Sequence, residues 1–266
     1  MRYDFHLHSA FSEDSESPMQ LMIEEGISRG LSTMCFTEHY DADFPDDEVS
    51  FSLDIEDYAA ALRQMKEAYQ DRIEILFGVE LGMQPHLGAH YQEYTSLWPF
   101  DYVIASQHLA DRMDPYYDAY WQTRSVHDGI ALYFRETLDG LRAMQDFDTL
   151  GHLDYIVRYA NRYGSDYSYA AYADLIDPIL QLIIERDKCL EVNTAGFKAG
   201  LGHPNPTEDV LRRYRELGGE HIIVGSDGHM PMHLAWEFDR IDALLKEVGF
   251  THHCIFRQRK RICLPL

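Results

Sequence analysis

Histidine and carboxylate residues, which are common ligands of divalent metal ions, close a series of short apolar runs along this chain. The residues in these positions are His6, His8, His39, Glu80, His108, His152, Asp227 and His229. If each run is a strand of one barrel, the last residues of all strands project onto the same face, so ligands far apart in the sequence converge in one pocket. The pattern therefore predicts a metal-centred active site.

The repetition of this placement is what gives the pattern its weight. His6 and His8 alone would be weak support, because paired histidines are also common on protein surfaces. Unrelated surface histidines would not all fall at strand ends, however, and this favours metal binding for the whole set. Imidazole and carboxylate ligands suit Zn, Mn and Fe(II) about equally. The lack of thiolates among them argues against a closed structural zinc site.

Strand-like and helix-like segments alternate along the chain, which is typical of repeated β-α units. The expected strands are Tyr3–His8, Thr33–His39, Ile73–Glu80, Tyr102–His108, Thr149–His152, Cys189–Asn193 and His221–Asp227. The expected helices are a segment capped by Ser17 and ending at Arg29, and then Leu53–Tyr69, Val126–Met144, Ser168–Glu185, Thr207–Leu217 and Met232–Val248. We expect a distorted (β/α)7 barrel of the TIM type. A doubly wound open sheet is the alternative, but it would cluster ligands at one switch point.

Length and composition suggest one domain spanning residues 1–266, since α/β barrels reach this size undivided. The formal net charge of −22 disfavours contact with nucleic acid or anionic membranes. With no leader-like or transmembrane segment apparent, we expect a cytoplasmic protein. The four cysteines form no Cys-x-x-Cys pair, and two of them lie inside predicted strands, where we expect small buried hydrophobic residues.

Four motifs resemble those of the polymerase and histidinol phosphatase (PHP) family of metallophosphoesterases over essentially the whole chain. They are His6-x-His8 followed by Ser12-Glu13-Asp14, then Thr37-Glu38-His39, then Gly78-Val79-Glu80, and finally Ser226-Asp227-Gly228-His229. Two further segments, Gly151–Tyr155 and Glu191–Gly196, are most similar to the stand-alone histidinol-phosphatases of histidine biosynthesis. The resemblance implies a PHP-type barrel and the hydrolysis of a small phosphate ester, L-histidinol phosphate.

The resemblance also implies three divalent ions and assigns their ligands. One ion takes His6, His8, Glu80 and Asp227, a second takes His108 and His152 with Glu80 as a bridge, and a third takes Asp14, His39 and His229. Glu13 is an alternative to Asp14. A bridging pair of ions would activate a water molecule for in-line attack and neutralise the phosphoryl oxygens. Asp227 or His229 would supply the proton that the leaving oxygen needs.

Basic residues are expected to bind the phosphate. Arg158 and Lys198 fall where the histidinol-phosphatases use basic residues, and His203 follows the sixth strand and is a candidate for the pocket wall. We expect the other histidines, at positions 86, 90, 127, 221, 233, 252 and 253, to be surface or packing residues.

Two irregular stretches follow ligand-bearing strands and should lie over the pocket. They are residues 40–52, which contain the acidic residues Asp41, Asp43, Asp46, Asp47 and Glu48, and residues 109–123, which are rich in Asp, Tyr and Trp. We expect carboxylates here, Asp43 and Asp46 in particular, to recognise a cationic substrate. The sequence Ser106-Gln107-His108 departs from the family's usual Gly-Ser-Val-His, so the wall beside His108 is expected to differ. Two alternatives are a phosphatase for a nucleotide, sugar phosphate or phosphotyrosine, and an inactive metal-binding module.

Overall fold

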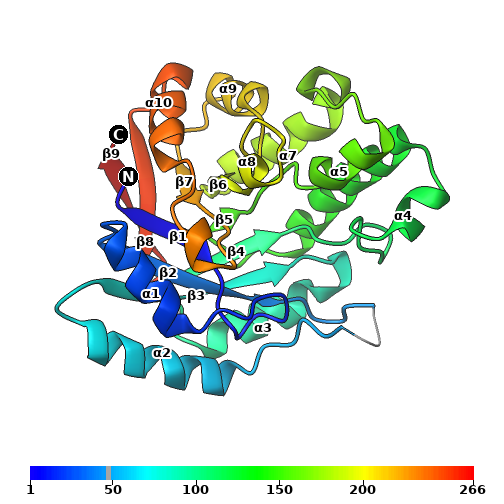
Figure 1. Cartoon of the computed structure of the whole chain (residues 1–266). Helices are drawn as coiled ribbons and strands as arrows, with labels where there is room; N and C mark the ends of the chain where they lie inside the picture. The colour runs from blue at the N-terminus through cyan, green and yellow to red at the C-terminus, as the bar shows by residue number, and fades with distance from the viewer. Residues whose placement is uncertain (46–48) are drawn as a thin grey trace.

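Seven parallel strands in sequential order form the central sheet of the protein, which we describe from a computed structural model covering residues 1–45 and 49–266. The strands are β1 (Tyr3–Leu7), β2 (Thr33–Tyr40), β3 (Glu74–Gly82), β4 (Tyr102–Ser106), β5 (Thr149–Leu150), β6 (Cys189–Asn193) and β7 (Ile222–Gly225). Helices surround the strands on the outside (Figure 1). Within the described residues, no helix is both long and apolar enough to span a bilayer. The predicted seven-stranded TIM-like barrel is confirmed.

The barrel is nearly closed because the carboxyl ends of β1 and β7 meet. The backbone amide of Asp227 donates to the carbonyl of His6 over 2.7 Å, and the amide of His8 donates to the carbonyl of Gly228 over 2.9 Å. Four of the residues expected in the site are therefore carried by one joined pair of strand ends: His6, His8, Asp227 and His229. Closure of the barrel and assembly of the site depend on the same backbone bonds.

The α-helices are α1 (Met19–Ser28), α2 (Ile55–Tyr69), α3 (Gly88–Leu97), α4 (Asp118–Gln122), α5 (Val126–Ala143), α6 (Val157–Ala160), α7 (Ala173–Glu185), α8 (Ala195–Lys198), α9 (Glu208–Glu216) and α10 (Phe238–Val248). Short 3-10 helices are η1 (Pro85–Leu87), η2 (Asn161–Tyr163), η3 (Tyr169–Ala171) and η4 (Pro231–His233). The helices predicted from the spacing of apolar residues are present, because in each one an apolar stripe packs on the sheet. The helices α7 and α10 begin several residues later than predicted, since η3 precedes α7 and η4 precedes α10.

The predicted cap of the first helix is wrong. Ser17 makes no capping bond to α1, and its hydroxyl instead donates to the backbone carbonyl of His229 over 2.9 Å. Ser15 donates to the same carbonyl over 2.9 Å. These serines therefore hold the loop after β7 against the loop after β1, next to the expected ligands.

A two-stranded antiparallel hairpin, β8 (His252–Arg257) and β9 (Lys260–Pro265), covers the amino end of the barrel and was not predicted. Its side chains Cys254, Ile255 and Phe256 pack against the inward-facing residues at the beginnings of the strands. The turn residues Gln258 and Arg259 have positive φ angles of 50° and 62°. Both chain ends lie beside this hairpin (Figure 1).

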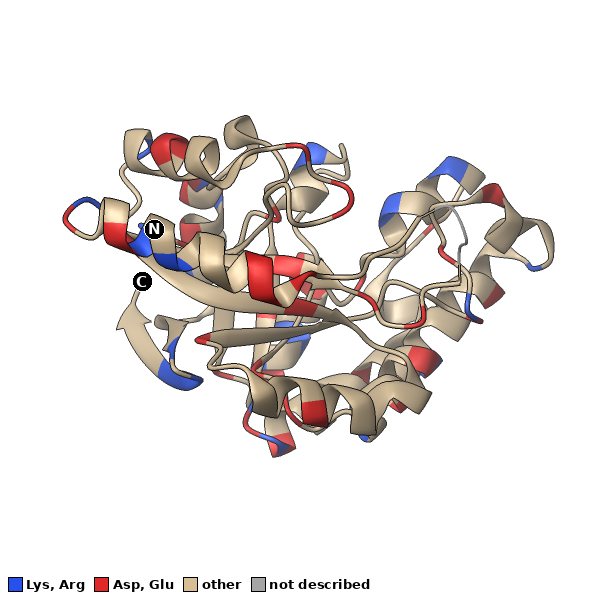
Figure 2. Cartoon of the chain, turned by 90° about the horizontal axis from the view of Figure 1, so that it is seen from below, with Lys and Arg blue, Asp and Glu red and all other residues tan. Residues whose placement is uncertain are grey.

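Charged residues of both signs are spread over many elements of the protein (Figure 2).

Candidate metal centre

The strand-end ligands line or underlie one cavity of about 580 Å³ at the carboxyl end of the barrel. His6, His8 and Glu80 are fully buried beneath it. The cavity is lined by Asp14, His39, His108, His152, Asp227 and His229, together with Arg158 and Lys198. Residues separated by more than 200 positions therefore converge here, as the barrel topology requires.

Glu80, on β3, lies at the centre of the cluster. Its Oε2 atom is 3.0 Å from His6 Nε2, 3.0 Å from His39 Nδ1 and 3.5 Å from His8 Nε2. Its Oε1 atom is 2.9 Å from His152 Nε2 and 3.3 Å from His108 Nε2. The two carboxylate oxygens thus face different groups of imidazoles, which is the arrangement that a bridging ligand needs.

Asp227 is shared between the same cluster and His229. Its Oδ1 atom lies 3.8 Å from His6 Nε2, 3.5 Å from His8 Nε2 and 3.4 Å from His229 Nδ1. The backbone of Asp227 has a φ of 52°, an uncommon value for a residue other than glycine, and such values concentrate at functional sites. The bond from its amide to β1 holds this conformation.

Asp14 is the acidic residue of the loop after β1 that faces the remaining ligands. Its Oδ2 atom is 3.1 Å from His229 Nε2 and 3.7 Å from His39 Nε2. The neighbouring Glu13 does not line the cavity. The geometry therefore favours Asp14 over Glu13 as the acidic member of the third group.

Electrostatics keep the carboxylates of the cluster ionised. Burial alone would raise the pKa of Glu80, but His6, His39 and His108 lower it well below its usual range. Burial opposes ionisation of Asp227 in the same way, and His6, His8 and His229 lower its pKa. For His8, burial and the nearby His39 and His229 lower the pKa, which keeps that imidazole neutral. Ionised carboxylates and a neutral imidazole are the forms that bind metal.

Several buried atoms in this cluster have no hydrogen-bond partner among the described residues. They are His6 Nε2, His8 Nε2, His39 Nδ1, Glu80 Oε2 and His229 Nε2. Leaving a buried polar atom unpaired costs about 1–3 kcal/mol. Because these atoms face one another and are all metal-type donors, divalent cations would satisfy them together. The residues present therefore fit a divalent metal centre.

A layer of acidic residues orients the ligands, and the sequence patterns did not identify it. Glu191 Oε1 accepts from His6 Nδ1 over 2.6 Å, and Asp41 Oδ1 accepts from His108 Nδ1 over 2.7 Å. Glu38 accepts from the hydroxyl of Ser12, which lies 3.1 Å from His8 Nδ1. Such carboxylates fix the orientation of ligating imidazoles. Glu38 and Glu191 lie inside apolar strands, and an acid in such a place was a usable signal.

The three residues expected to bind substrate have different positions. Arg158, at α6, and Lys198, at the end of α8, line the cavity, and Lys198 Nζ donates to the carbonyl of Asp227 over 2.7 Å. His203 does not line this cavity, because its ring turns toward its own loop and lies 2.7 Å from the carbonyl of Pro204. Of the histidines that were expected to be surface or packing residues, His233 lines the cavity.

The two irregular loops do lie over the pocket, as predicted. Val49 and Phe51 come from the first loop, and Asp114, Tyr116 and Tyr117 come from the second. Burial raises the pKa of Asp114 to about 6. Tyr155 and Tyr159 complete this wall, with their hydroxyls 2.6 Å apart.

Asp43, which was expected to recognise the substrate, is not among the residues that line this cavity. Its carboxylate lies 2.7 Å from Arg112 Nη1 and 2.8 Å from His86 Nε2. Asp46, Asp47 and Glu48 lie outside the described residues. Gln107 is buried and donates to the carbonyl of Leu109, so the unusual residue of the fourth strand is not part of the cavity lining.

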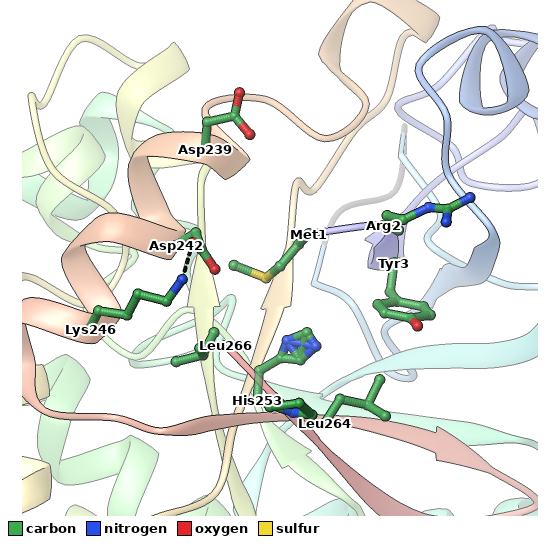
Figure 3. A pocket seen from close by; sticks show the side chains of 10 residues that line it. Met1, Arg2, Tyr3, Asp239, Asp242, Lys246, His253, Leu264 and Leu266 are labelled. Atoms are coloured by element: carbon green, nitrogen blue, oxygen red, sulfur yellow. Dashed lines mark hydrogen bonds and ion pairs between the residues drawn. The ribbon is translucent and has the colours of Figure 1, made fainter.

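A second cavity, of about 620 Å³, lies between the two chain ends and α10 (Figure 3). Met1, Arg2, His253 and Leu266 are among the residues that line it. Its Lys246 is already paired with Asp242 over 2.7 Å. Its size is similar to that of the first cavity, but it does not contain the cluster of histidines and carboxylates. The candidate metal centre is therefore the cavity at the carboxyl ends of the barrel strands.

Comparison with known proteins gives a consistent result. The PHP domain family model matches residues 4–195. The chain is 28% identical to the histidinol-phosphatase of Lactococcus lactis, over 97% of this chain and 96% of the relative. It is 32% identical to the probable histidinol-phosphatase of Clostridium acetobutylicum, over 86% and 87% of the two chains.

The fold is also similar to solved structures. One is the crystal structure of the Lactococcus lactis histidinol phosphate phosphatase in complex with zinc, L-histidinol and phosphate, with a TM-score of 0.89, 29% identity and 98% coverage of both chains. The putative histidinol phosphatase of Listeria monocytogenes has a TM-score of 0.76 at 18% identity, covering 90% of this chain and 99% of that one, and shows the fold alone.

Proposed function

The chain belongs to the PHP domain family, and we propose that it is a metal-dependent phosphatase that hydrolyses L-histidinol phosphate to L-histidinol and phosphate. The observation that carries the proposal is the meeting of unpaired metal-type donors with two cationic side chains in one cavity. The Lactococcus lactis relative, which binds zinc, L-histidinol and phosphate, supports this choice of substrate.

We propose three divalent ions, of Zn, Mn or Fe, with the ligand groups given by the family resemblance. The separate contacts of the two Glu80 oxygens support its role as a bridge between the first two ions. The contacts of Asp14 with His39 and His229 support the third group. Elemental analysis after metal-supplemented expression should find about three divalent ions per chain in this centre. Less than one equivalent would contradict the assignment.

Each side chain of the cavity has a role in the proposed reaction. When bound, the divalent ions would activate water and neutralise the phosphoryl oxygens. Arg158 and Lys198 would hold the phosphate in line for attack, because both line the cavity at the site of the ligands. Asp227 or His229 would deliver the proton to the leaving oxygen. Glu191 and Asp41 would keep the imidazoles of His6 and His108 oriented.

We propose that Asp114, rather than Asp43, recognises the cationic part of the substrate. Histidinol phosphate carries an ammonium group and an imidazole, and a selective pocket should offer a carboxylate and aromatic surface to them. Asp114 lines the cavity beside Tyr116 and Tyr155, whereas Asp43 is already paired with Arg112. The carboxylate of Asp114 accepts from the amide of Tyr116 over 2.8 Å, and a neutral ester would leave its negative charge without a cationic partner.

A panel of phosphate esters, assayed on metal-loaded protein, tests this function. Histidinol phosphate should exceed neutral esters of similar size by about a hundredfold in kcat/KM, because a polar pocket strongly rejects a ligand that cannot pair with it. If a nucleotide, sugar phosphate or phosphotyrosine were best, the substrate would be wrong and the phosphatase chemistry would stand. Hydrolysis of no ester at all would indicate an inactive metal-binding module.

A further inference from the structure

Two cysteines of the β8–β9 hairpin and a histidine that precedes β7 meet at the amino end of the barrel, opposite the proposed catalytic centre. Cys254 on β8 and Cys263 on β9 are directly paired across the hairpin, with their sulfur atoms 3.5 Å apart. His221, just before β7, places its Nδ1 atom 4.0 Å from the sulfur of Cys254. The three donor atoms all lie within 4.8 Å of one another.

These distances are closer to those of metal ligands than to those of a disulfide. A disulfide requires sulfur atoms about 2.05 Å apart. Two thiolates bound tetrahedrally to zinc, at about 2.3 Å each, lie roughly 3.8 Å apart. The distance of 3.5 Å between Cys254 and Cys263 is therefore within a few tenths of an ångström of the separation that zinc imposes.

The surroundings of the three residues also suit a cation. The other ring nitrogen of His221, Nε2, lies 3.4 Å from Asp187 Oδ1, which directs Nδ1 toward the cysteines. A carboxylate behind a ligating histidine is a recurring feature of metal sites. Arg261 pairs with Asp187 over 2.8 Å and holds that carboxylate in place. A cavity of about 340 Å³, lined by His221 and Cys263 among others, gives access from solvent.

We propose that His221, Cys254 and Cys263 bind one thiophilic divalent cation, of the Zn²⁺ class, at a site separate from the catalytic centre. Because β8 and β9 carry the two sulfur ligands and His221 precedes β7, the ion would tie the hairpin to the base of the barrel. This site is independent of the proposed phosphatase activity.

Binding must displace protons from the thiols. A hydrogen-bond contact with Cys189, followed by burial, raises the pKa of Cys254, and burial raises the pKa of Cys263. Both thiols are therefore protonated before the ion binds. One bound cation would release two protons to solvent and form two metal–sulfur bonds, with no change of oxidation state.

Cobalt(II) is a suitable probe, because thiolate ligands give it an intense near-ultraviolet charge-transfer band that imidazole and carboxylate ligands do not. The proposed catalytic ligands include no sulfur, so the band reports on this site alone. We expect chelator-stripped, fully reduced full-length protein to develop the band and, at saturation, to bind about one more cobalt ion per chain than Cys263→Ser does. Asp187→Asn should weaken cobalt binding at this site by about tenfold.

Matched variants locate the signal. Cys263 is exposed, so Cys263→Ser should fold normally and abolish the charge-transfer band. Cys35→Ala, at a buried cysteine elsewhere in the barrel, should keep it, as should Glu80→Ala. No band in the reduced wild-type protein, or a band that survives Cys263→Ser, would overturn the proposal. A Cys254–Cys263 disulfide in freshly purified protein, with no cobalt band after reduction, would also overturn it in favour of a redox pair.

Discussion

Glu80 is the residue on which the proposed catalytic chemistry most depends, since its carboxylate lies within 3.5 Å of five imidazoles. Removing it would separate two ions that must act together. We expect Glu80→Ala to lower kcat by at least about a thousandfold, a loss typical of removing a preorganised electrostatic group. Steady-state kinetics should show the loss of kcat, and metal analysis of the same variant should show a loss of bound metal.

Glu13→Ala is the matched control for this variant, because Glu13 is an exposed acid in the loop that carries Asp14. It should leave turnover and metal content nearly unchanged. Near-normal turnover in Glu80→Ala would show that the carboxylate is not a bridge.

Arg158 tests the phosphate-binding role without disturbing the metal ligands. It lines the cavity but remains exposed at its mouth, so its contact with phosphate is partly screened. We expect Arg158→Ala to lower kcat/KM by about tenfold, mainly through KM, which is the lower end of the range for a charge-assisted contact. Metal content should not change. Arg162→Ala serves as the control, because Arg162 is a nearby exposed arginine that does not line the cavity. If the two substitutions lowered kcat/KM equally, Arg158 would have no specific role in binding phosphate.

Asp114 should give the pH dependence of substrate recognition. Burial raises its pKa to about 6, so the carboxylate becomes negative as the pH rises through that value. If it binds the ammonium group, kcat/KM for histidinol phosphate should rise over the same range, and Asp114→Asn should remove this rise. A generic aryl phosphate should not respond to the substitution. An unchanged pH profile in Asp114→Asn would exclude the role.

The same carboxylate should reduce stability. Because the pKa of Asp114 is higher in the folded protein than in the unfolded chain, the folded state binds the proton more tightly, and stability falls as the pH rises from about 4 to about 6. Asp114→Asn should therefore raise the free energy of unfolding by about 1–2 kcal/mol above pH 6. Denaturant titrations at about pH 5 and about pH 7.5 should find the larger gain at the higher pH. A loss of stability at the higher pH would show that the carboxylate is well solvated.

At the scale of elements, the sequence predicts the strands and the ligands better than the contacts between elements. A residue such as His152 could be placed because a strand end fixes where its side chain projects. Asp41 and Asp114 could not be assigned in this way, because irregular loops set their direction. Asp43 lies two residues from Asp41 and faces Arg112 instead of the cavity.

The β8–β9 hairpin shows another limit of sequence patterns. A two-residue turn with two positive φ angles usually contains asparagine, aspartate or glycine, and here it contains Gln258 and Arg259. The conformation is held from outside the hairpin. The carboxylate of Asp101 accepts from the amide of Gln258 over 3.0 Å, and its carbonyl accepts from the amide of Arg259 over 2.9 Å. A tertiary contact with Asp101 therefore stabilises a turn conformation that the local sequence does not favour.

Asp101 is therefore expected to matter for stability although it lies far from the proposed active site. Its carboxylate also accepts from the amide of Phe77 over 2.9 Å, so Asp101→Ala would leave two backbone donors without their partner. We expect a loss of about 2–4 kcal/mol in the free energy of unfolding. Asp139→Ala, which removes only an exposed pair with Arg142, should cost less than about 1 kcal/mol. Denaturant unfolding compares the two, and equal losses would mean that Asp101 does not hold the turn.

At the scale of the whole molecule, the proposed catalytic centre joins the two ends of the sheet. Asp4 on β1 accepts from the amides of Ser226 and Ala235, over 3.0 Å and 2.9 Å, so the first strand is bonded to the segment after the last barrel strand. Proposed metal ligands lie on both sides of this junction. The chain also carries a formal charge of −22, part of which bound divalent ions would offset. We therefore propose that residues 1–266 form one domain whose folding is coupled to metal binding.

Removal of metal tests this coupling in the intact protein. Ions that bind only the folded state stabilise it by RT ln(1 + [L]/Kd), which is about 2.7 kcal/mol when the free ion is at a hundred times its Kd. A strong chelator should lower the melting temperature by at least about 5 °C, as expected for a loss of this size in a protein of this length. Circular dichroism and tryptophan fluorescence should report one coincident transition with and without metal, because β1 and β7 cannot separate independently. Glu80→Ala should melt at a lower temperature than the wild type and respond less to the chelator. Two separated transitions would contradict the single domain, and an unchanged melting temperature after verified metal removal would contradict the coupling.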